Sequence, residues 1–315
     1  MGKKTSLIAG GAGFVGSHLC ARLLNMGDKV ICLDNLSTGR RQNIRKFLSH
    51  RNFRFIRQDV VKKLNLKIDE IYHLASLASP SHYQKDPIAT WQANTLGTLN
   101  LLQLAKKHHA KFLFASTSEV YGDPLQHPQK ETYFGNVNPV GVRSCYDESK
   151  RAGETLCMDY FRKFKLPVKI VRIFNTYGPR MALDDGRVVS NFIVQALLGK
   201  ALTIYGSGNQ TRSFMYVDDL VEGLLKVMAS KNFTGPVNLG NPHEFTVIKL
   251  AQLVIKLTKS KSRIVYRPLP QDDPERRRPD IGLARRKLRW APQVRLRQGL
   301  RKTIGYFDNC LTSVK

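Results

Sequence analysis

Tyr146 and Lys150 are four residues apart in a segment rich in good helix formers. On a helix, residues with this spacing share one face, so the phenol and the ammonium group would be neighbours. A neighbouring lysine stabilises a phenolate and lowers the pKa of the tyrosine from its ordinary value of about 10. The phenolate could remove a proton from a hydroxyl while a hydride leaves for a nicotinamide. The pair is a candidate for alcohol oxidation, although this spacing also occurs by chance on ordinary helix faces.

A glycine-rich segment near the N-terminus could bind the nicotinamide dinucleotide. Glycines at positions 10, 13 and 16 lie between an apolar strand candidate at residues 6–9 and a helical pattern. Glycines let a backbone approach a pyrophosphate closely, and the following helix presents free N–H groups to it. A second apolar strand candidate ends at Asp34, whose carboxylate could accept hydrogen bonds from both ribose hydroxyls and would repel a 2′-phosphate. The segment therefore indicates NAD rather than NADP.

Alternating strand and helix candidates would position these residues. Further apolar strands are expected at residues 53–56, 71–75, 111–115 and 168–174, with a long helix over residues 91–108. This alternation predicts an α/β fold: a Rossmann-type doubly wound parallel sheet with a smaller C-terminal substrate-binding α/β lobe.

Domain boundaries follow from the same pattern. We expect an NAD-binding domain over residues 1–180 and a mainly substrate-binding lobe over residues 181–315. A strand near residues 236–240 should return to the first sheet, so the lobe is discontinuous. Ligands of such sheets bind beyond the carboxyl ends of the strands, where Thr117, Ser118, Glu119 and Asn175 are expected.

Composition narrows the partners. The 315 residues carry a formal charge of +27, from 51 basic and 24 acidic residues. The basic residues are spread along the chain without a DNA- or RNA-binding motif, so we expect no nucleic-acid partner. No segment approaches the roughly 20 uncharged apolar residues of a membrane helix, so we expect no membrane contact either.

The cysteines and histidines do not suggest a metal site. The five cysteines are scattered without a Cys-x-x-Cys pair, which argues against zinc or a disulfide framework and favours a reducing cytoplasm. The eight histidines show no ligand spacing. We expect no metal.

The glycine loop, Asp34, the serine- and threonine-rich strand end and the Tyr/Lys pair together resemble the extended short-chain dehydrogenase/reductase family. Longer runs, in the same order along the chain, resemble its UDP-glucuronate decarboxylases. These runs are residues 116–124 (STSEVYGDP), 135–139 (GNVNP), 172–181 (RIFNTYGPRM), 185–192 (DGRVVSNF), 210–214 (QTRSF), 272–274 (DDP) and 277–280 (RRPD).

This resemblance implies a reaction and roles for the residues. Bound NAD⁺ would oxidise the C4 hydroxyl of UDP-glucuronate, the 4-ketone would allow loss of CO₂, and reduction would give UDP-xylose with the cofactor restored. Tyr146 would be the base and Lys150 would tune it, while Thr117 and Ser118 would hold the hydroxyl. Glu119 would lie near C5. The planar fork of Arg277 would meet the sugar carboxylate or the intermediate.

The resemblance also implies two sets of binding residues. The cofactor set comprises Gly10, Gly13, Phe14, Val15, Gly16, Asp34, Asn35, Ser37, Thr38, Gly39, Asp59, Val60, Leu74, Ala75, Ala78, Tyr146 and Lys150. The substrate set comprises Pro80, Tyr83, Asn175, Arg180, Val188, Asn191, Tyr205, Gln210, Arg212 and Arg277. For Val188 and Tyr205, simple core packing is an equally good interpretation.

One departure and several alternatives remain. Ser149 stands where the family usually has glycine, between the catalytic pair. A UDP-sugar 4-epimerase or a dTDP-sugar 4,6-dehydratase would share most of these features, and a binding protein for nucleotide sugars or nucleic acid without turnover is the alternative from another class. The resemblance further implies a homodimer with a four-helix interface built from residues 91–108 and 145–164.

Overall fold

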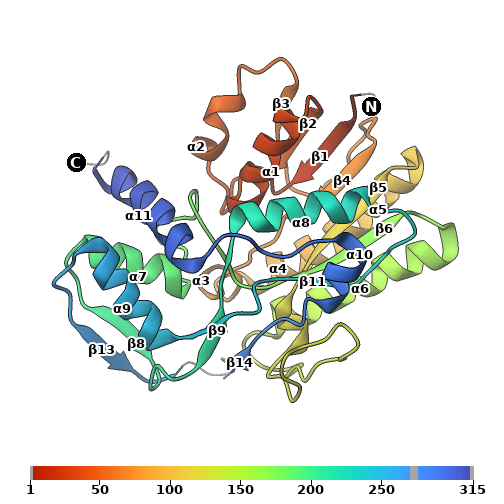
Figure 1. The fold of residues 1–315 in the computed structure, drawn as a ribbon. Coiled ribbons are helices and arrows are strands. Elements are labelled where there is room, and N and C mark those ends of the chain that lie inside the picture. The colour runs from red at the N-terminus through yellow and green to blue at the C-terminus, as the bar shows by residue number, and fades with distance from the viewer. Residues whose placement is uncertain (1–2, 270–275, 313–315) are drawn as a thin grey trace.

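The computed structural model of the chain describes residues 3–269 and 276–312, and its centre is a seven-stranded parallel sheet (Figure 1). The sheet confirms the predicted doubly wound fold. The strand order turns back between β1 and β4, which is the point where such folds bind ligands. In sheet order the strands are β11 (Val237–Leu239), β6 (Val168–Ile173), β5 (Lys111–Thr117), β4 (Glu70–His73), β1 (Thr5–Ala9), β2 (Lys29–Asp34) and β3 (Phe53–Arg57).

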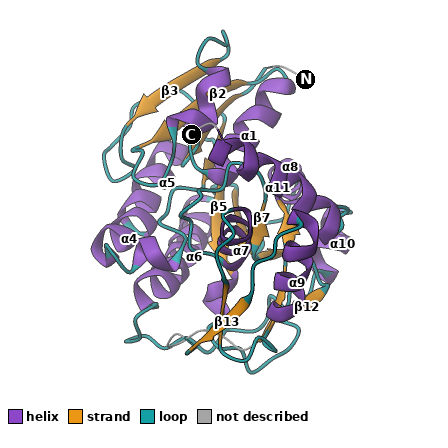
Figure 2. Cartoon of the chain, turned by 90° about the vertical axis from the view of Figure 1, so that its left-hand side faces the viewer, coloured by secondary structure: helices purple, strands orange, loops and turns teal. Residues whose placement is uncertain are grey.

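Helices cover both faces of the sheet because successive side chains of each strand point to opposite faces. In β1, Ile8 packs into the apolar core with α1 and α8, whereas Leu7 packs into the core with α5 and α6. Figure 2 shows the sheet edge-on between these layers. No described helix is both long enough and apolar enough to cross a membrane. The four covering helices are α1 (Phe14–Asn25), α8 (Val217–Ala229), α5 (Leu96–His108) and α6 (Ser144–Phe164).

The long helix expected over residues 91–108 is two helices. α4 (Pro87–Asn94) ends before Thr95, and α5 begins at Leu96. The hydroxyl of Thr95 donates to the carbonyl of Trp91 at 2.7 Å, and that of Thr98 donates to the carbonyl of Asn94 at 2.6 Å. Such hydroxyl contacts to the preceding turn bend helices, and two of them lie at this break.

Smaller elements form the second lobe at the lower part of Figure 1, while the second half of the chain also supplies β11 and α8 to the main sheet and its cover. The second lobe contains paired strands β8 and β13, a three-stranded sheet in the order β12–β9–β14, and the short pair β7–β10 beside the main sheet. Their bounds are β7 (Thr176–Tyr177), β8 (Leu202–Tyr205), β9 (Thr211–Ser213), β10 (Met215–Tyr216), β12 (Glu244–Thr246), β13 (Ile264–Arg267) and β14 (Arg276–Arg277).

The remaining helices pack around these strands or connect them. α7, α9, α10 and α11 share the apolar core of α1 and α8. The bounds are α2 (Arg41–Ile44), α3 (Pro80–Tyr83), α7 (Val188–Leu197), α9 (Val247–Thr258), α10 (Gly282–Leu288) and α11 (Leu296–Thr312), with 3-10 turns η1 (Arg45–Phe47) and η2 (Ser118–Tyr121).

Ser149 links α6 to α4 from a fully buried position. Its hydroxyl donates to the carbonyl of Cys145 at 2.5 Å and accepts from the side-chain amide of Asn94 at 2.9 Å. The residue that departs from the family pattern therefore bonds to a neighbouring helix, which glycine could not do.

We expect Ser149→Ala to lower the free energy of unfolding by about 1–3 kcal/mol, because it leaves the buried Asn94 amide without its acceptor. Urea denaturation followed by circular dichroism measures this. Thr155→Ala is the matched control, since its hydroxyl donates to the carbonyl of Arg151 on the exposed face of the same helix. Equal effects of the two substitutions would contradict the prediction.

Candidate active site

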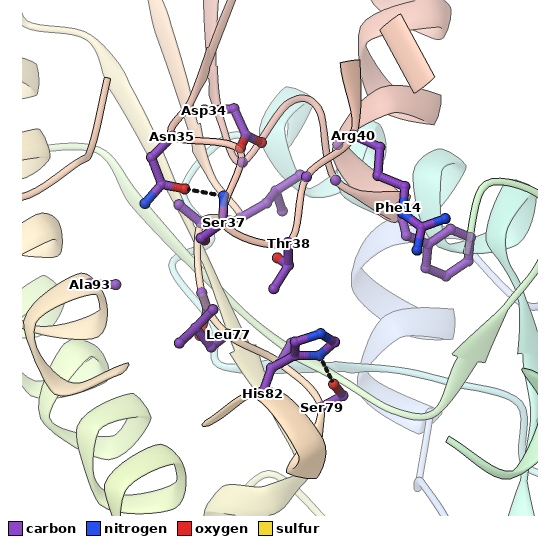
Figure 3. Close-up of a pocket in the computed structure, with 18 of the residues that line it drawn as sticks. Phe14, Asp34, Asn35, Ser37, Thr38, Arg40, Leu77, Ser79, His82 and Ala93 are labelled. Atoms are coloured by element: carbon purple, nitrogen blue, oxygen red, sulfur yellow. Dashed lines mark hydrogen bonds between the residues drawn. The ribbon is translucent and has the colours of Figure 1, made fainter. Parts of the chain in front are cut away.

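A cavity of about 670 Å³ opens beyond the carboxyl ends of β1, β2 and β4, at the point where the strand order turns back (Figure 3). Apart from Tyr146 and Lys150, every residue that the sequence suggested for the cofactor lines this cavity. They are Gly10, Gly13, Phe14, Val15, Gly16, Asp34, Asn35, Ser37, Thr38, Gly39, Asp59, Val60, Leu74, Ala75 and Ala78.

The glycine loop leaves a cradle that side chains would fill. Gly10 has a φ of +82°, and a Cβ atom on it would lie 2.8 Å from the backbone nitrogen of Ala75. A Cβ atom on Gly16 would collide with the carbonyl of Gly10. Gly13 caps α1 and has no side chain to occupy the first N–H groups of that helix. This backbone fits a pyrophosphate, which needs close approach and free N–H donors.

Asp34 is held for ribose recognition at the end of β2. Its Oδ2 accepts from the Ala12 N–H at 2.9 Å and its Oδ1 from the Leu36 N–H at 2.8 Å. A carboxylate has about four lone-pair positions, so further acceptor capacity remains for hydroxyl groups. Burial raises the pKa of Asp34, and these two hydrogen bonds oppose the shift. A Cβ atom on Gly39 would lie 2.5 Å from Asp34 Oδ1, so the glycine leaves room beside the carboxylate.

The neighbouring loop is ordered by its own polar contacts. Asn35 accepts from the Ser37 N–H at 2.9 Å, as Figure 3 shows, and donates to Asp59 at 2.6 Å. These contacts fix the loop after β2 against the segment after β3, at the end of the cavity where an adenosine would lie.

Tyr146 lies in the first turns of α6 with its side chain buried. Its ring stacks on Tyr83, with centroids 5.1 Å apart and planes 7° from parallel. Thr117, which ends β5, lies close enough to Tyr146 to lower its pKa. The predicted base Tyr146, the hydroxyl-binding residue Thr117 and the predicted substrate residue Tyr83 are thus brought together.

Lys150 differs from the expectation. Its Nζ donates to the carbonyl of Ala115 at 2.8 Å and lies 5.8 Å from the centroid of the Tyr146 ring. Burial raises the pKa of Tyr146, and the hydrogen bond with Thr117 only opposes this. The lowering of that pKa by Lys150 stays a prediction, because here the ammonium group is held by a strand carbonyl and burial dominates the pKa of Tyr146. Burial lowers the pKa of Lys150 itself to about 7.

Glu119 and two arginines form a largely buried cluster, and the charge of Glu119 acts on Tyr146. Glu119 Oε2 lies 2.6 Å from Arg143 Nη2 and 3.3 Å from Arg277 Nη2. Burial alone would raise the pKa of Glu119, but the charges of Arg277 and Arg143 lower it to about 2. Glu119 is therefore a carboxylate at every physiological pH.

Arg277 is the largest of the fully buried side chains, at 1% exposure. It donates to the carbonyls of Ser118 and Gly122, the latter at 2.9 Å. Arg212 on β9 is its partner in the β9–β14 register, and the charge of Arg212 also acts on Glu119. Residues from well-separated segments of the chain thus meet at the end of β5. The predicted match at residues 272–274 lies outside the described residues.

The rest of the predicted substrate set is spread more widely. Arg180 lines the cofactor cavity and donates to the carbonyl of Ser17 at 2.9 Å. Tyr205 is 46% exposed, so core packing is not its role. The others lie at element ends: Pro80 begins α3, Asn175 precedes β7, Val188 begins α7, Asn191 donates to the carbonyl of Gly186, and Gln210 donates to the carbonyl of Tyr205.

Apart from the segment at residues 79–83, which the resemblance places facing the sugar, several polar residues of the site were not found from the sequence. Arg187 donates to Asp185 through Nε at 2.5 Å and through Nη2 at 2.8 Å, and both residues line the cavity. Ser79 and His82 form a contact of 2.5 Å that Figure 3 shows at the cavity wall. Arg143, which pairs with Glu119, stands only three residues before Tyr146, and this proximity was the one available signal.

Two further features complete the description. Arg40 lines the cavity and pairs with Asp184 at 2.5 Å, joining the segment before α2 to the segment before α7. The described residues contain no group of three His, Cys, Asp or Glu side chains that could hold a metal ion.

Comparison with known proteins gives close relatives along most of the chain. The chain is 58% identical over 294 residues to UDP-glucuronic acid decarboxylase 4 of Arabidopsis thaliana, which covers 93% of this chain and 66% of that protein. It is 56% identical over 306 residues to UDP-glucuronic acid decarboxylase 1 of Danio rerio, covering 97% and 73%. The chain thus spans just under two thirds of the length of the plant relative.

A solved structure has the same fold at lower identity. The UDP-glucuronic acid 4-epimerase of Bacillus cereus, solved with UDP-glucuronic acid and NAD, superposes with a TM-score of 0.89 at 30% identity, over 97% of this chain and 99% of that one. The model of the NAD dependent epimerase/dehydratase family matches residues 6–240. The glycine cradle, the ribose carboxylate and these similarities agree, and the chain belongs to the NAD dependent epimerase/dehydratase family.

Proposed function

We propose that this protein decarboxylates UDP-glucuronate to UDP-xylose with NAD as a cofactor that is restored in each turnover. The observation that carries the proposal is that two arginines, the partly buried Arg143 and the buried Arg277, pair with Glu119, whose charge acts on Tyr146. It occurs in a chain 58% identical to a plant protein named UDP-glucuronic acid decarboxylase. An acidic sugar needs such cations, whereas oxidation of a hydroxyl alone does not.

The first step uses the hydroxyl groups at the end of β5. The Tyr146 oxygen, in its phenolate form, takes the proton of the sugar C4 hydroxyl, while Thr117 and Ser118 orient that hydroxyl. Because burial raises the pKa of Tyr146, the phenol must first lose its own proton, and Lys150, 5.8 Å from the ring centroid, is the residue expected to favour that loss. When bound, NAD⁺ would supply the acceptor for the C4 hydride and the source from which it is returned. Burial of Tyr146 excludes water from the proton transfer.

The second step uses the charged cluster. A ketone at C4 makes the C5 carboxylate that of a β-keto acid, so the bond between C5 and the carboxylate carbon breaks and CO₂ leaves. The electron pair of that bond enters an enolate, which takes up a proton from water at C5. Arg277 and Arg143 recognise the acidic sugar, and the carboxylate of Glu119 limits how tightly they do so. This limit matters because strong binding of the ground-state carboxylate would slow its departure.

A sibling reaction is the second candidate. The Bacillus cereus protein is named a UDP-glucuronic acid 4-epimerase and shares this fold at 30% identity. The same Tyr146, Thr117 and NAD would serve inversion at C4, as they would a 4,6-dehydration. A protein that binds nucleotide sugars without turnover is the remaining alternative.

We expect purified protein to release CO₂ from UDP-glucuronate and to form UDP-xylose without net consumption of NAD. Tyr146→Phe should lower kcat by about 100- to 10,000-fold, the usual contribution of a general base, while UDP binding persists. Tyr160→Phe, on the same helix, should leave the rate unchanged. Trapping of isotopically labelled CO₂ measures the first product, and nuclear magnetic resonance of the sugar identifies the second, for the parent protein and for both variants. A change at C4 without CO₂ would identify an epimerase, and undiminished turnover by Tyr146→Phe would refute the assigned base.

Asp34→Asn should weaken NAD binding about tenfold or more, because hydrogen bonds to a charged group contribute about 1.5–3 kcal/mol each. Removing the negative charge should also reduce the preference of the protein for NAD over NADP, because a 2′-phosphate would no longer be repelled. Fluorescence titration with both cofactors measures the two affinities. Asp69→Asn is the control, since Asp69 also accepts a backbone hydrogen bond, from Thr5, but does not line the cavity. An unaltered NAD affinity would show that Asp34 does not meet the ribose.

We also infer a homodimer assembled through α4, α5 and α6. These helices expose large apolar side chains, and contiguous exposed apolar surface commonly marks an interface. The exposed side chains are Ile88, Trp91, Leu96, Phe161 and Phe164.

All five thiols are free, in keeping with the reducing cytoplasm expected from the sequence, and the compartment stays a prediction.

Trp91→Glu combined with Phe161→Glu should convert the dimer into monomers, because charges would be buried without partners at the interface. Sedimentation equilibrium measures the mass. Leu125→Glu combined with Val140→Glu changes more exposed apolar residues outside these helices and should leave the dimer intact. A monomeric parent protein would contradict the inferred interface.

A further inference from the structure

Gln129 is a fully buried residue in the loop between η2 and α6, and the mechanism above does not use it. Its backbone N–H donates to the carbonyl of Arg278 at 2.9 Å, and its carbonyl accepts from the Asp280 N–H at 2.8 Å. Its side-chain Oε1 accepts from the Arg278 N–H at 2.8 Å, while Nε2 donates to the carbonyl of Gln126 at 2.8 Å. Both the backbone and the side chain of Gln129 therefore bind the segment that directly follows β14.

Ser213 holds the preceding residue of that segment, Arg277. Ser213 ends β9 and is 2% exposed, and its hydroxyl donates to the carbonyl of Arg277 at 2.8 Å. Strands β9 and β14 pair in parallel, with Arg212 opposite Arg277. The carbonyl of Arg277 is thus bound by Ser213, and the next residue along the chain is bound by Gln129.

The loop that contains Gln129 is itself anchored to the main sheet. Asn238 on β11 is fully buried, and its Nδ2 donates to the carbonyls of Gln129 at 3.0 Å and Asp280 at 3.1 Å. Its Oδ1 accepts from the hydroxyl of Tyr121 in η2 at 2.8 Å. The loop, the segment after β14 and the η2 turn are therefore joined to one strand of the sheet.

The side chain of Arg277 has little freedom to compensate for a displacement of its backbone. It is buried, and its guanidinium group donates to the carbonyls of Ser118 and Gly122 beside Glu119. Protein interiors are closely packed, so a buried side chain has little room for another rotamer. The position of this positive charge is therefore determined by the contacts that hold the backbone.

We propose that Gln129 and Ser213 are positioning residues, which fix the backbone of Arg277 and thereby determine how strongly the site prefers an acidic sugar to a neutral one. Neither residue needs to touch the sugar for this effect, because Arg277 supplies the charge. The identity of the acidic sugar as UDP-glucuronate rests on the proposed function, whereas the contacts that hold Arg277 do not.

The test compares the binding of two nucleotide sugars that differ in the carboxylate. In Tyr146→Phe protein with NAD present, isothermal titration calorimetry gives the Kd of UDP-glucuronate and of UDP-xylose. Gln129→Met has a side chain of similar length but offers the Arg278 N–H no amide oxygen. It should raise the Kd of UDP-glucuronate about tenfold, because hydrogen bonds to a displaced charged group weaken steeply with poorer geometry. The Kd of UDP-xylose should change little, since this sugar has no carboxylate.

Ser213→Ala is a smaller change that removes the other contact, and it should shift the ratio of the two Kd values in the same direction. Gln195→Met is the matched control, because Gln195 Oε1 also accepts from a strand N–H, that of Thr203, at 3.1 Å. The control should leave the ratio unchanged. Circular dichroism establishes that each variant is folded, and if Gln129→Met is not, the ratio in Ser213→Ala decides.

A merely structural role would weaken the binding of both sugars to the same extent. Equal changes of the two Kd values, or an unchanged Kd of UDP-glucuronate, would therefore overturn the proposal. The same shift of the ratio in Gln195→Met would overturn it too, because the effect would then not depend on Arg277.

The outcomes separate this proposal from the proposed function. A reduced preference for UDP-glucuronate in the variants, but no CO₂ from the parent protein, would support the positioning role and refute decarboxylation. Release of CO₂ by the parent, with an unchanged preference in the variants, would do the reverse. Absence of UDP-glucuronate binding before either substitution would overturn both.

Discussion

The carboxylate of Glu119 is enclosed by guanidinium groups from distant parts of the chain, and the arrangement of the site depends on this pairing. A buried carboxylate is tolerated only with counter-charges close by, and removing one partner of such a pair is strongly destabilising. Arg277 reaches Glu119 from β14 and also binds the carbonyls of Ser118 and Gly122. The end of β5, the start of α6 and the second lobe therefore meet at one point, which holds Tyr146 near Thr117.

The sequence predicted the cofactor side of the molecule well because the determinants are local. Gly10, Gly16 and Asp34 belong to one strand–turn–helix–strand unit, whose geometry follows from short-range contacts. The spacing of these residues along the chain therefore predicts their relative positions in the structure. The parallel sheet was predictable for a similar reason, since its strands, apart from the partly exposed edge strand β3, are short apolar runs buried on both faces.

The substrate side was harder to predict because its contacts are distant in sequence. Nothing in the local pattern around Arg143 says that a glutamate will lie beside it. The hydrogen-bond partner of Lys150 could not be predicted either, since its ammonium group binds a carbonyl of β5, which is distant in the sequence. The break at Thr95 was not predictable because the apolar spacing continues across it. The side-chain hydrogen bonds that bend the helix there do not change that spacing.

The ion pair between Arg40 and Asp184 affects how readily a molecule leaves the cavity. It ties the cavity-lining residue Arg40 to the segment before α7, beside the space that would hold the cofactor, so a molecule held there would leave more easily once the two side chains part. Both groups are well exposed, with 43% and 77% of their side-chain surface accessible, and exposed pairs of this kind contribute about 0–1 kcal/mol. This ion pair is therefore weak. The retention of a bound dinucleotide would depend on the many contacts along the cavity rather than on this pair.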